Sequence, residues 1–333
     1  MRHLSSGRVL LALALLASIA APLLLGGVEA LDAARTLSRA HLATIVGVTV
    51  LGWCARGAKL WLLARRAGIV LRPLQSLAIS LATDFGFLAT PAGLGGYAAN
   101  LLLLRRAGST TAAATAVVAA DQIVDALFFG FVLPIAALCA LGSAIPDIML
   151  RGAFFGSGVL VAVIALAFTL RRPLGRRLAR FAHAPRRGAR FARLHDLLAR
   201  ALHDTSYLLR GDTRAGVALA LLTGVQWTTR YGVLWLALAA FGHDVPYSVT
   251  LLAQGVVMHV AQWTGVPSGA GGAEFGLAAA LAPWISASAL APVLLVWRAA
   301  TLHLALLAGG IALAWRLRDG TAPVQLEPVG ESP

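Results

Sequence analysis

The chain has 333 residues, of which 59% are hydrophobic and only 13% are charged, and its mean hydropathy is +0.79. Soluble domains are close to half apolar and a quarter charged, so this composition excludes an ordinary soluble protein and indicates a membrane protein. The formal net charge of +14 does not indicate nucleic-acid binding, because the arginines cluster between apolar runs rather than on a polar face with aromatic residues.

The first apolar run follows Arg2 and Arg8 and is long enough to cross a membrane, so we expect an uncleaved first helix rather than a removed signal peptide. Further runs of similar length recur along the chain. The predicted full spans are 8–27, 40–64, 112–142, 152–170, 213–241 and 288–316. The second span ends in Lys59, Arg65 and Arg66. The sequence therefore predicts an all-α, polytopic integral membrane protein with about six full spans in a single membrane domain over 1–318.

Two further apolar segments are each too short to cross the membrane twice, and the pattern Pro-x-Gly-x-Gly-Gly interrupts each of them. These breaks lie at 91–96 and 267–272. Non-helical backbone at membrane depth is tolerated where protein or a water-filled cavity covers it. We therefore predict two re-entrant hairpins, each entering and leaving on one side of the membrane. Close packing of helices is the alternative role of such glycines.

The two hairpin regions resemble each other, with a first repeat over about 73–142 and a second over about 246–316. About thirty residues beyond each break stands a charged residue, Asp121 in the first repeat and Arg298 in the second. Lys and Arg gather at one set of span ends, which the positive-inside rule assigns to the cytoplasm together with both termini. The hairpins then enter a bacterial inner membrane from opposite faces and form an inverted repeat. Such repeats enclose a site near the midplane that opens alternately to each side.

One soluble-looking segment, about 171–212, holds about a dozen arginines and has apolar residues at helical spacing. It predicts a basic amphipathic surface helix at about 187–210. The basic residues from 171 to 214 either contact anionic lipid or serve only as a topology signal. The tail, 319–333, is predicted to be disordered. The scattered histidines and two cysteines suggest no metal site, and no cofactor is expected.

Charge at the centre of a bilayer is costly and is usually paired or functional. The charged candidates are Asp84, Asp121, Asp125, Arg230, Glu274 and Arg298. Asp121 and Asp125 share one helix face and would repel each other without a cation, so Arg298 is their predicted partner. In one interpretation, Arg298 and Arg230 bind lipid phosphate in a cavity, while the acids bind a cationic group or carry protons. In the other, the charges form a static salt bridge that joins the repeats.

The two breaks add further candidate cavity residues. A half-helix N-terminus points backbone N–H groups at its ligand and can hold phosphate, which is the role expected at the start of each return leg. Gln122, beside Asp121, is included as well. The break residues are Pro91, Gly93, Gly95, Gly96, Pro267, Gly269, Gly271 and Gly272.

Residues 72–131, with the first break and the stretch Asp121-Gln122-Ile123-Val124-Asp125, resemble the flippase-like membrane domain of lysylphosphatidylglycerol synthases. The second half resembles it too, through 267–274 and Arg298, and the likeness covers about 8–316. It implies a stand-alone member of this family with a lipid-translocating role. It does not imply aminoacyl-lipid synthesis, which belongs to a separate soluble catalytic domain in that family.

This sequence departs from the family pattern in its first half. Gly96 and Asn100 stand where the family usually has an acid after the break and a basic residue one turn later. Gln122 replaces a basic residue, and Asp84 stands where an asparagine is common. The changed charge puts the substrate's head group in question more than the mode of transport.

The sequence thus predicts a lipid flippase or transporter that moves a phospholipid or lipid-linked head group through a charged midplane cavity. A membrane enzyme acting on a lipid is one alternative, but we find no nucleophile paired with a base and no metal cluster, so no enzymatic activity is expected. The other alternative is an accessory or scaffold protein that binds a lipid-modifying or glycosyl-transfer enzyme through its basic segment.

Overall fold

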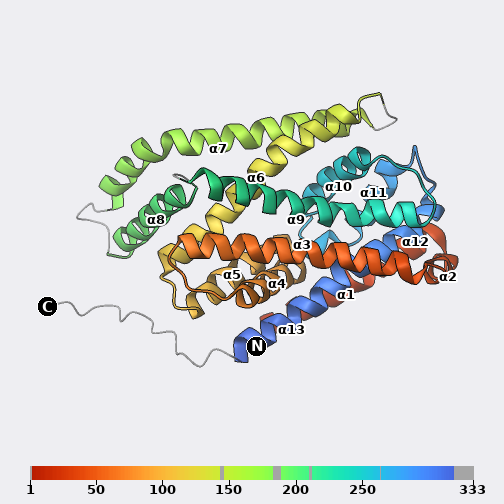
Figure 1. The fold of residues 1–333 in the computed structure, drawn as a ribbon, viewed down its shortest axis with the longest axis horizontal. Coiled ribbons are helices and arrows are strands. Elements are labelled where there is room, and N and C mark those ends of the chain that lie inside the picture. The colour runs from red at the N-terminus through yellow and green to blue at the C-terminus, as the bar shows by residue number, and fades with distance from the viewer. Residues whose placement is uncertain (1, 143–145, 183–188, 210–211, 263, 319–333) are drawn as a thin grey trace.

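The computed structural model describes residues 2–142, 146–182, 189–209, 212–262 and 264–318. Within these ranges the chain is built from helices, without strands (Figure 1). The predicted all-α membrane fold is confirmed. The predicted disordered tail, 319–333, lies outside the described residues, as do the side chains from 171 to 195 of the basic segment.

Four helices in the described ranges are long and apolar enough to cross a membrane. They are α1 (Arg2–Gly26), α3 (Arg39–Arg66), α6 (Thr111–Cys139), and one continuous helix made of α12 (Ala287–Arg298), the π-helical turn η3 (Ala299–His303) and α13 (Leu304–Arg318). The other two predicted spans fall in the long helices α7 (Asp147–Ala182) and α9 (Thr213–Ala240). A polar stretch around 226–230 makes α9 less apolar. The count of six crossings stays a prediction.

Polar side chains begin three of the long helices by capping free backbone N–H groups. The Ser38 hydroxyl accepts a hydrogen bond from the first turn of α3, and the Thr110 hydroxyl does so for α6. The Asp212 carboxylate accepts from two N–H groups at the start of α9. A short helix, α2 (Glu29–Arg35), connects α1 to α3.

Each Pro-x-Gly sequence separates two short helices. The first set is α4 (Pro73–Ala89), η1 (Pro91–Gly93) and α5 (Leu94–Arg106), and the second is α10 (Tyr247–Gln262), η2 (Pro267–Gly269) and α11 (Gly272–Leu281). The backbone has the same form at both breaks, since φ is positive at Ala92 (51°), Gly93 (71°), Ser268 (55°) and Gly269 (61°). A positive φ is uncommon for non-glycine residues and marks a backbone conformation that the surrounding structure must hold.

The two hairpins extend from opposite ends of the bundle and meet in its middle. Helices α3 and α9 are antiparallel, because Arg66 at the end of α3 is paired with Asp212 at the start of α9, while Gly52 contacts Thr229 along their length. The first hairpin follows α3 and the second follows α9, so they start at opposite ends (Figure 1). Their breaks η1 and η2 are in contact. This is the arrangement that an inverted repeat requires.

Helix α7 continues past the predicted end of its span at 170 and reaches Ala182, into the basic segment. The predicted amphipathic helix corresponds to α8 (Ala189–Leu208). Its buried residues Ala201 and Leu208 belong to a face that packs against α6, where the Thr205 hydroxyl also donates to the Ala116 carbonyl. That apolar face is therefore occupied by protein rather than by the membrane surface.

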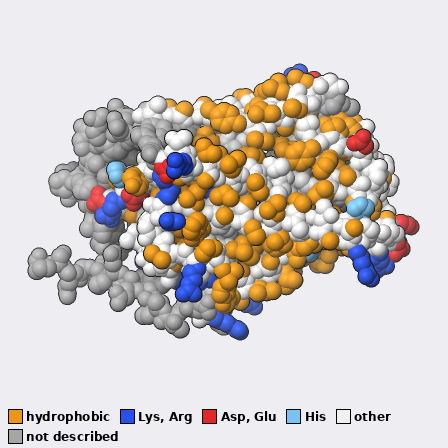
Figure 2. All heavy atoms as spheres, in the orientation of Figure 1, with side chains coloured by type: hydrophobic (Ala, Val, Ile, Leu, Met, Phe, Trp, Pro, Cys, Tyr) orange, Lys and Arg blue, Asp and Glu red, His pale blue; other side chains and the backbone are white. Residues whose placement is uncertain are grey.

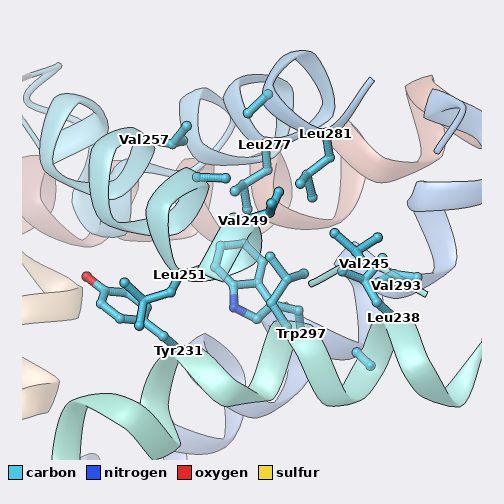
Figure 3. Close-up of a cluster of buried hydrophobic side chains, with 14 of the residues drawn as sticks. Tyr231, Leu238, Val245, Val249, Leu251, Val257, Leu277, Leu281, Val293 and Trp297 are labelled. Atoms are coloured by element: carbon cyan, nitrogen blue, oxygen red, sulfur yellow. The ribbon is translucent and has the colours of Figure 1, made fainter. Parts of the chain in front are cut away.

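The largest hydrophobic core surrounds the second hairpin. Figure 3 shows Trp297 of α12 between side chains of α9, such as Leu238, and those of α10 and α11, such as Val249 and Leu277. The outer surface is also apolar: in Figure 2, most charged side chains lie toward the two ends of the long axis, with hydrophobic and uncharged atoms between them. Exposed residues such as Leu24 (78%) fit a surface that faces lipid.

Candidate functional site

A cavity of about 350 Å³ lies where the two breaks meet, and we call it the central cavity. Both breaks contribute to its wall, through Ala92 and Gly93 from the first and Ser268 from the second. Polar and charged side chains from six helices complete the polar part of the wall. These are Arg56, Asp84, Tyr97, Gln122, Asp125, Trp227, Arg230, His259 and Gln262. Of the predicted site residues, Asp84, Gly93, Gln122, Asp125 and Arg230 line this cavity, and the others lie outside its wall.

Asp121 and Asp125 are paired with Lys59, so the prediction that Arg298 is their partner is wrong. The Lys59 ammonium lies 2.7 Å from Asp121 Oδ1 and 2.6 Å from Asp125 Oδ1. The lysine side chain is fully buried. It also does not end the second span as predicted, because α3 continues for about two more turns, to Arg66.

Arg298 is paired instead with Glu274 in its own repeat. Its Nε donates to Glu274 Oε1 at 2.7 Å and its Nη2 donates to Oε2 at 3.0 Å, and both side chains are almost completely buried. Nη1 donates to the Ser268 carbonyl oxygen at 3.3 Å, and the guanidinium lies 4.5 Å from the centroid of the Trp297 ring. A bidentate, fully enclosed pair of this kind holds the second break in place and is closed to a ligand.

The first break is stabilised by contacts from α3. Arg56 forms an ion pair with Asp84 of α4, and its guanidinium lies 5.6 Å from the centre of the Phe87 ring. The Phe87 ring also packs edge-on against Tyr97 of α5. Among the described residues, no ion pair joins the two predicted repeats, so the interpretation of a salt bridge between them is wrong as stated. The repeats meet instead by packing of α4 against α13, of α6 against α10 and of η1 against η2.

Arg230 is the one charged candidate that has no ionic partner among the residues that the structure describes. It lies more than two turns from either end of α9, is half-buried, and lines the central cavity. Its guanidinium carbon lies 5.7 Å from the centre of the Trp227 ring. It forms neither an ion pair nor a hydrogen bond with any residue in the described part of the chain.

Trp227 connects Arg230 to the carboxylates. Its indole Nε1 donates to Asp125 Oδ1 at 2.9 Å, and the Arg230 guanidinium lies over the face of its ring. Asp125 Oδ1 therefore accepts from both Lys59 and Trp227. Gln122, the neighbour of Asp121, accepts from the Tyr97 hydroxyl at 3.2 Å and also lies on the cavity wall.

The glycines of the breaks serve packing more than ligand binding. A side chain on Gly95 would meet Thr90, and one on Gly96 would meet the Phe87 ring, so both glycines allow α5 to approach α4 closely. At the second break the Gly271 N–H donates to Glu274 Oε2 at 2.8 Å. This N–H group is therefore already bonded and does not offer the predicted phosphate contact.

Arg56 and the buried role of Lys59 were not predicted from the amino-acid sequence. Both lie inside the predicted span 40–64, three residues apart and so on one face of a helix. The criterion that selected the other candidates, a charge inside a membrane span, applies equally to these two. Lys59 was assigned to the end of the span because Arg65 and Arg66 follow it closely. Trp227 gave no comparable signal, because tryptophan in an apolar run is common.

Comparison with known proteins agrees with this architecture. The chain matches the family model described as lysylphosphatidylglycerol synthase TM region over residues 9–309. It is also similar to a UPF0104 membrane protein of Archaeoglobus fulgidus, with 21% identity over 281 residues that cover 80% of this chain and 83% of that protein. The matched region contains both hairpins and every charged residue of the central cavity. The chain is therefore a multi-pass membrane protein that belongs to the family of the lysylphosphatidylglycerol synthase transmembrane region.

Proposed function

We propose that this protein moves a phospholipid or a lipid-linked head group across the membrane, and that the central cavity binds the polar head. Membership of the family supports a role in the membrane, and its transmembrane region is often flippase-like. Two antiparallel hairpins with touching breaks form the kind of frame in which rocking of one half against the other exposes a midplane site to each side.

The observation that carries the proposal is the free guanidinium of Arg230 in the cavity wall. Arg56, Lys59 and Arg298 are each held by carboxylates, whereas Arg230 has none among the described residues. A charge inside a membrane protein is expensive without a counter-ion. A phosphate supplies one, because the planar fork of arginine matches two phosphate oxygens. Arg230 is therefore the proposed site for the lipid phosphate.

A second group at the cavity wall is suited to the same head group. The Ser268 hydroxyl is buried and has no hydrogen-bond partner among the described residues, and Ser268 lines the central cavity. A buried hydroxyl without a partner is uncommon and calls for a missing partner. A phosphate or glycerol oxygen of the head group would provide it. A cavity of about 350 Å³ is of a size that suits a polar head rather than a whole lipid.

Reconstitution into liposomes that contain a fluorescently labelled anionic phospholipid tests the proposal. The Arg230→Ala variant removes charge-assisted hydrogen bonds of about 1.5–3 kcal/mol, so we expect lipid movement to slow by about 10- to 150-fold. Arg230→Lys keeps the positive charge but lacks the two parallel N–H donors of the guanidinium, so it should retain part of the lipid movement. The matched control is Arg35→Ala, whose salt bridge with Asp32 is exposed.

The three possible results separate the classes of function. Loss of lipid movement in correctly folded Arg230→Ala supports the transporter. Equal lipid movement in liposomes with and without the protein refutes the transporter and favours the accessory or scaffold role. Deletion of 180–210 then tests that role, since it should abolish binding of the partner enzyme. Formation of a modified lipid by the purified protein would establish an enzyme instead.

We also propose that both termini face the cytoplasm of the cell. Figure 1 shows the end of α13 and the start of α1 toward the side on which α8 lies. The same end of the bundle carries the basic ends of α3 and α5, with Arg65, Arg66, Arg105 and Arg106. An excess of Lys and Arg next to span ends marks the cytoplasmic side. Contact of the basic 171–214 segment with anionic lipid on that side belongs to the same proposal.

A further inference from the structure

Beside the central cavity, two carboxylates share a single ammonium group. Lys59 lies within 2.7 Å of an oxygen of both Asp121 and Asp125. All three side chains are buried, with exposed fractions of 0%, 7% and 12% respectively. When all three groups are ionised, the cluster carries one excess negative charge. Such a charge is costly in a membrane interior unless another cation or a proton balances it.

The wider set of groups facing the cavity and this cluster balances that charge. From each helix packed against the site, the titratable or charged groups are Arg56 and Lys59 of α3, Asp84 of α4, Tyr97 of α5, Asp121 and Asp125 of α6, Arg230 and Tyr231 of α9 and His259 of α10. Counted from its arginine, lysine and aspartate side chains, the set contains three cations and three carboxylates. The site without a ligand is therefore electrically neutral.

A bound anionic head group disturbs this neutrality. A phosphodiester at Arg230 adds one negative charge, which leaves the loaded site with a net charge of about −1. Uptake of one proton returns the loaded site to zero. On the basis of the proposed function, we infer that the protein takes up one proton together with each anionic lipid head group, and that Asp125 is the carboxylate that receives it.

The geometry selects Asp125 over Asp121. Asp125 lines the central cavity, whereas Asp121 is not part of its wall. Lys59 and Trp227 both donate to Oδ1 of Asp125. Its other oxygen, Oδ2, accepts no hydrogen bond from any described residue. Both oxygens of Asp121 are engaged, by Lys59 and by Gln122 at 3.4 Å. The proton leaves a hydronium ion of the solvent, which becomes water as its O–H bond breaks, and forms an O–H bond with Oδ2 of Asp125.

Trp227 provides the physical connection between the two events. Its N–H group donates a hydrogen bond to Asp125, and the Arg230 guanidinium lies over its ring. Only the Trp227 side chain therefore separates a phosphate bound to Arg230 from the Asp125 carboxylate. Coupling between two ligands is reciprocal. A lipid phosphate therefore favours the protonated cavity, and a proton favours lipid binding. A proton gradient across the membrane would then drive the anionic lipid in the direction in which protons flow.

Binding of a short-chain phosphatidylglycerol to the purified full-length protein in a zwitterionic detergent tests this inference. Calorimetry gives the affinity, and a pH indicator in weakly buffered solution gives the protons taken up. For the natural protein we expect about one proton per bound lipid and an affinity that weakens by up to about tenfold per pH unit as the pH rises. For Asp125→Asn, which keeps the shape and the two Oδ1 contacts, we expect binding without proton uptake and no pH dependence.

Asp32→Asn is the matched control, because it makes the same change at a carboxylate that is exposed and lies outside the central cavity. We expect the control to take up protons as the natural protein does. Lipid binding without proton uptake in the natural protein, or unchanged uptake in Asp125→Asn, would overturn the inference and leave the proposed function standing. Failure of the natural protein to bind the lipid would overturn both.

Discussion

The buried pair between Arg298 and Glu274 allows a quantitative test of how the second break is held. Arg298→Met keeps most of the side-chain volume but leaves the Glu274 carboxylate, which is 0% exposed, without its bidentate partner. Removing one partner of a buried ion pair costs about 3–5 kcal/mol, mostly because the remaining charge is left uncompensated. The same change also frees the Ser268 carbonyl from its hydrogen bond. We therefore expect the free energy of unfolding to fall by about 3–5 kcal/mol.

A double-mutant cycle distinguishes loss of the pair from loss of packing. Glu274→Gln removes the charge yet keeps an oxygen that can accept from the Gly271 N–H. Combined with Arg298→Met, it should be at least 1 kcal/mol more stable than the single arginine variant, since no buried charge is then unpaired. Unfolding by titration with a denaturing detergent, followed by circular dichroism, gives these free energies.

Two outcomes would contradict a buried, interacting pair of Arg298 and Glu274. Strict additivity of the two changes would mean that the side chains do not interact in the folded protein. A loss below about 1 kcal/mol for Arg298→Met would place the pair in a solvated environment. Arg35→Ala serves as the control for an exposed pair, because Arg35 and Asp32 are 77% and 76% exposed and should contribute less than about 1 kcal/mol.

Three further predictions follow from the same contacts. Lys59→Met should destabilise the protein by about 3–5 kcal/mol in the same unfolding assay, and neutralising both carboxylates that it binds should recover part of this loss. Gly96→Ala should cost about 1–3 kcal/mol because its methyl group meets the Phe87 ring, whereas Gly272→Ala, with no atom closer than 3.9 Å, should be nearly neutral. Asp32→Cys should react with a membrane-impermeant thiol reagent in intact cells, and reaction only after permeabilisation would reverse the proposed orientation.

The class of fold and the places where the helices break follow directly from the order of the amino acids. Apolar runs of membrane length require helices, because a backbone in lipid must satisfy its own hydrogen bonds. The Pro-x-Gly breaks were also fixed locally, since proline cannot continue a helix on its N-terminal side and glycine adopts positive φ readily. The observed short helices α4, α5, α10 and α11 follow from these rules.

Which charges are paired depends on how the helices pack in three dimensions. The sequence placed Arg298 at the position in the second repeat that matches Asp121 in the first, and symmetry made them look like partners. In the folded protein, α3 packs against α4 and α6 and brings Lys59 to the two aspartates, while Arg298 turns to Glu274. Pairing depends on the rotation of each helix about its axis and on the helices that it contacts. The spacing of residues within one helix specifies neither of these. For the same reason the sequence could name Arg230 as a charged candidate. It could not show that Arg230 alone, of the charged candidates, forms no direct ion pair within the described part of the chain.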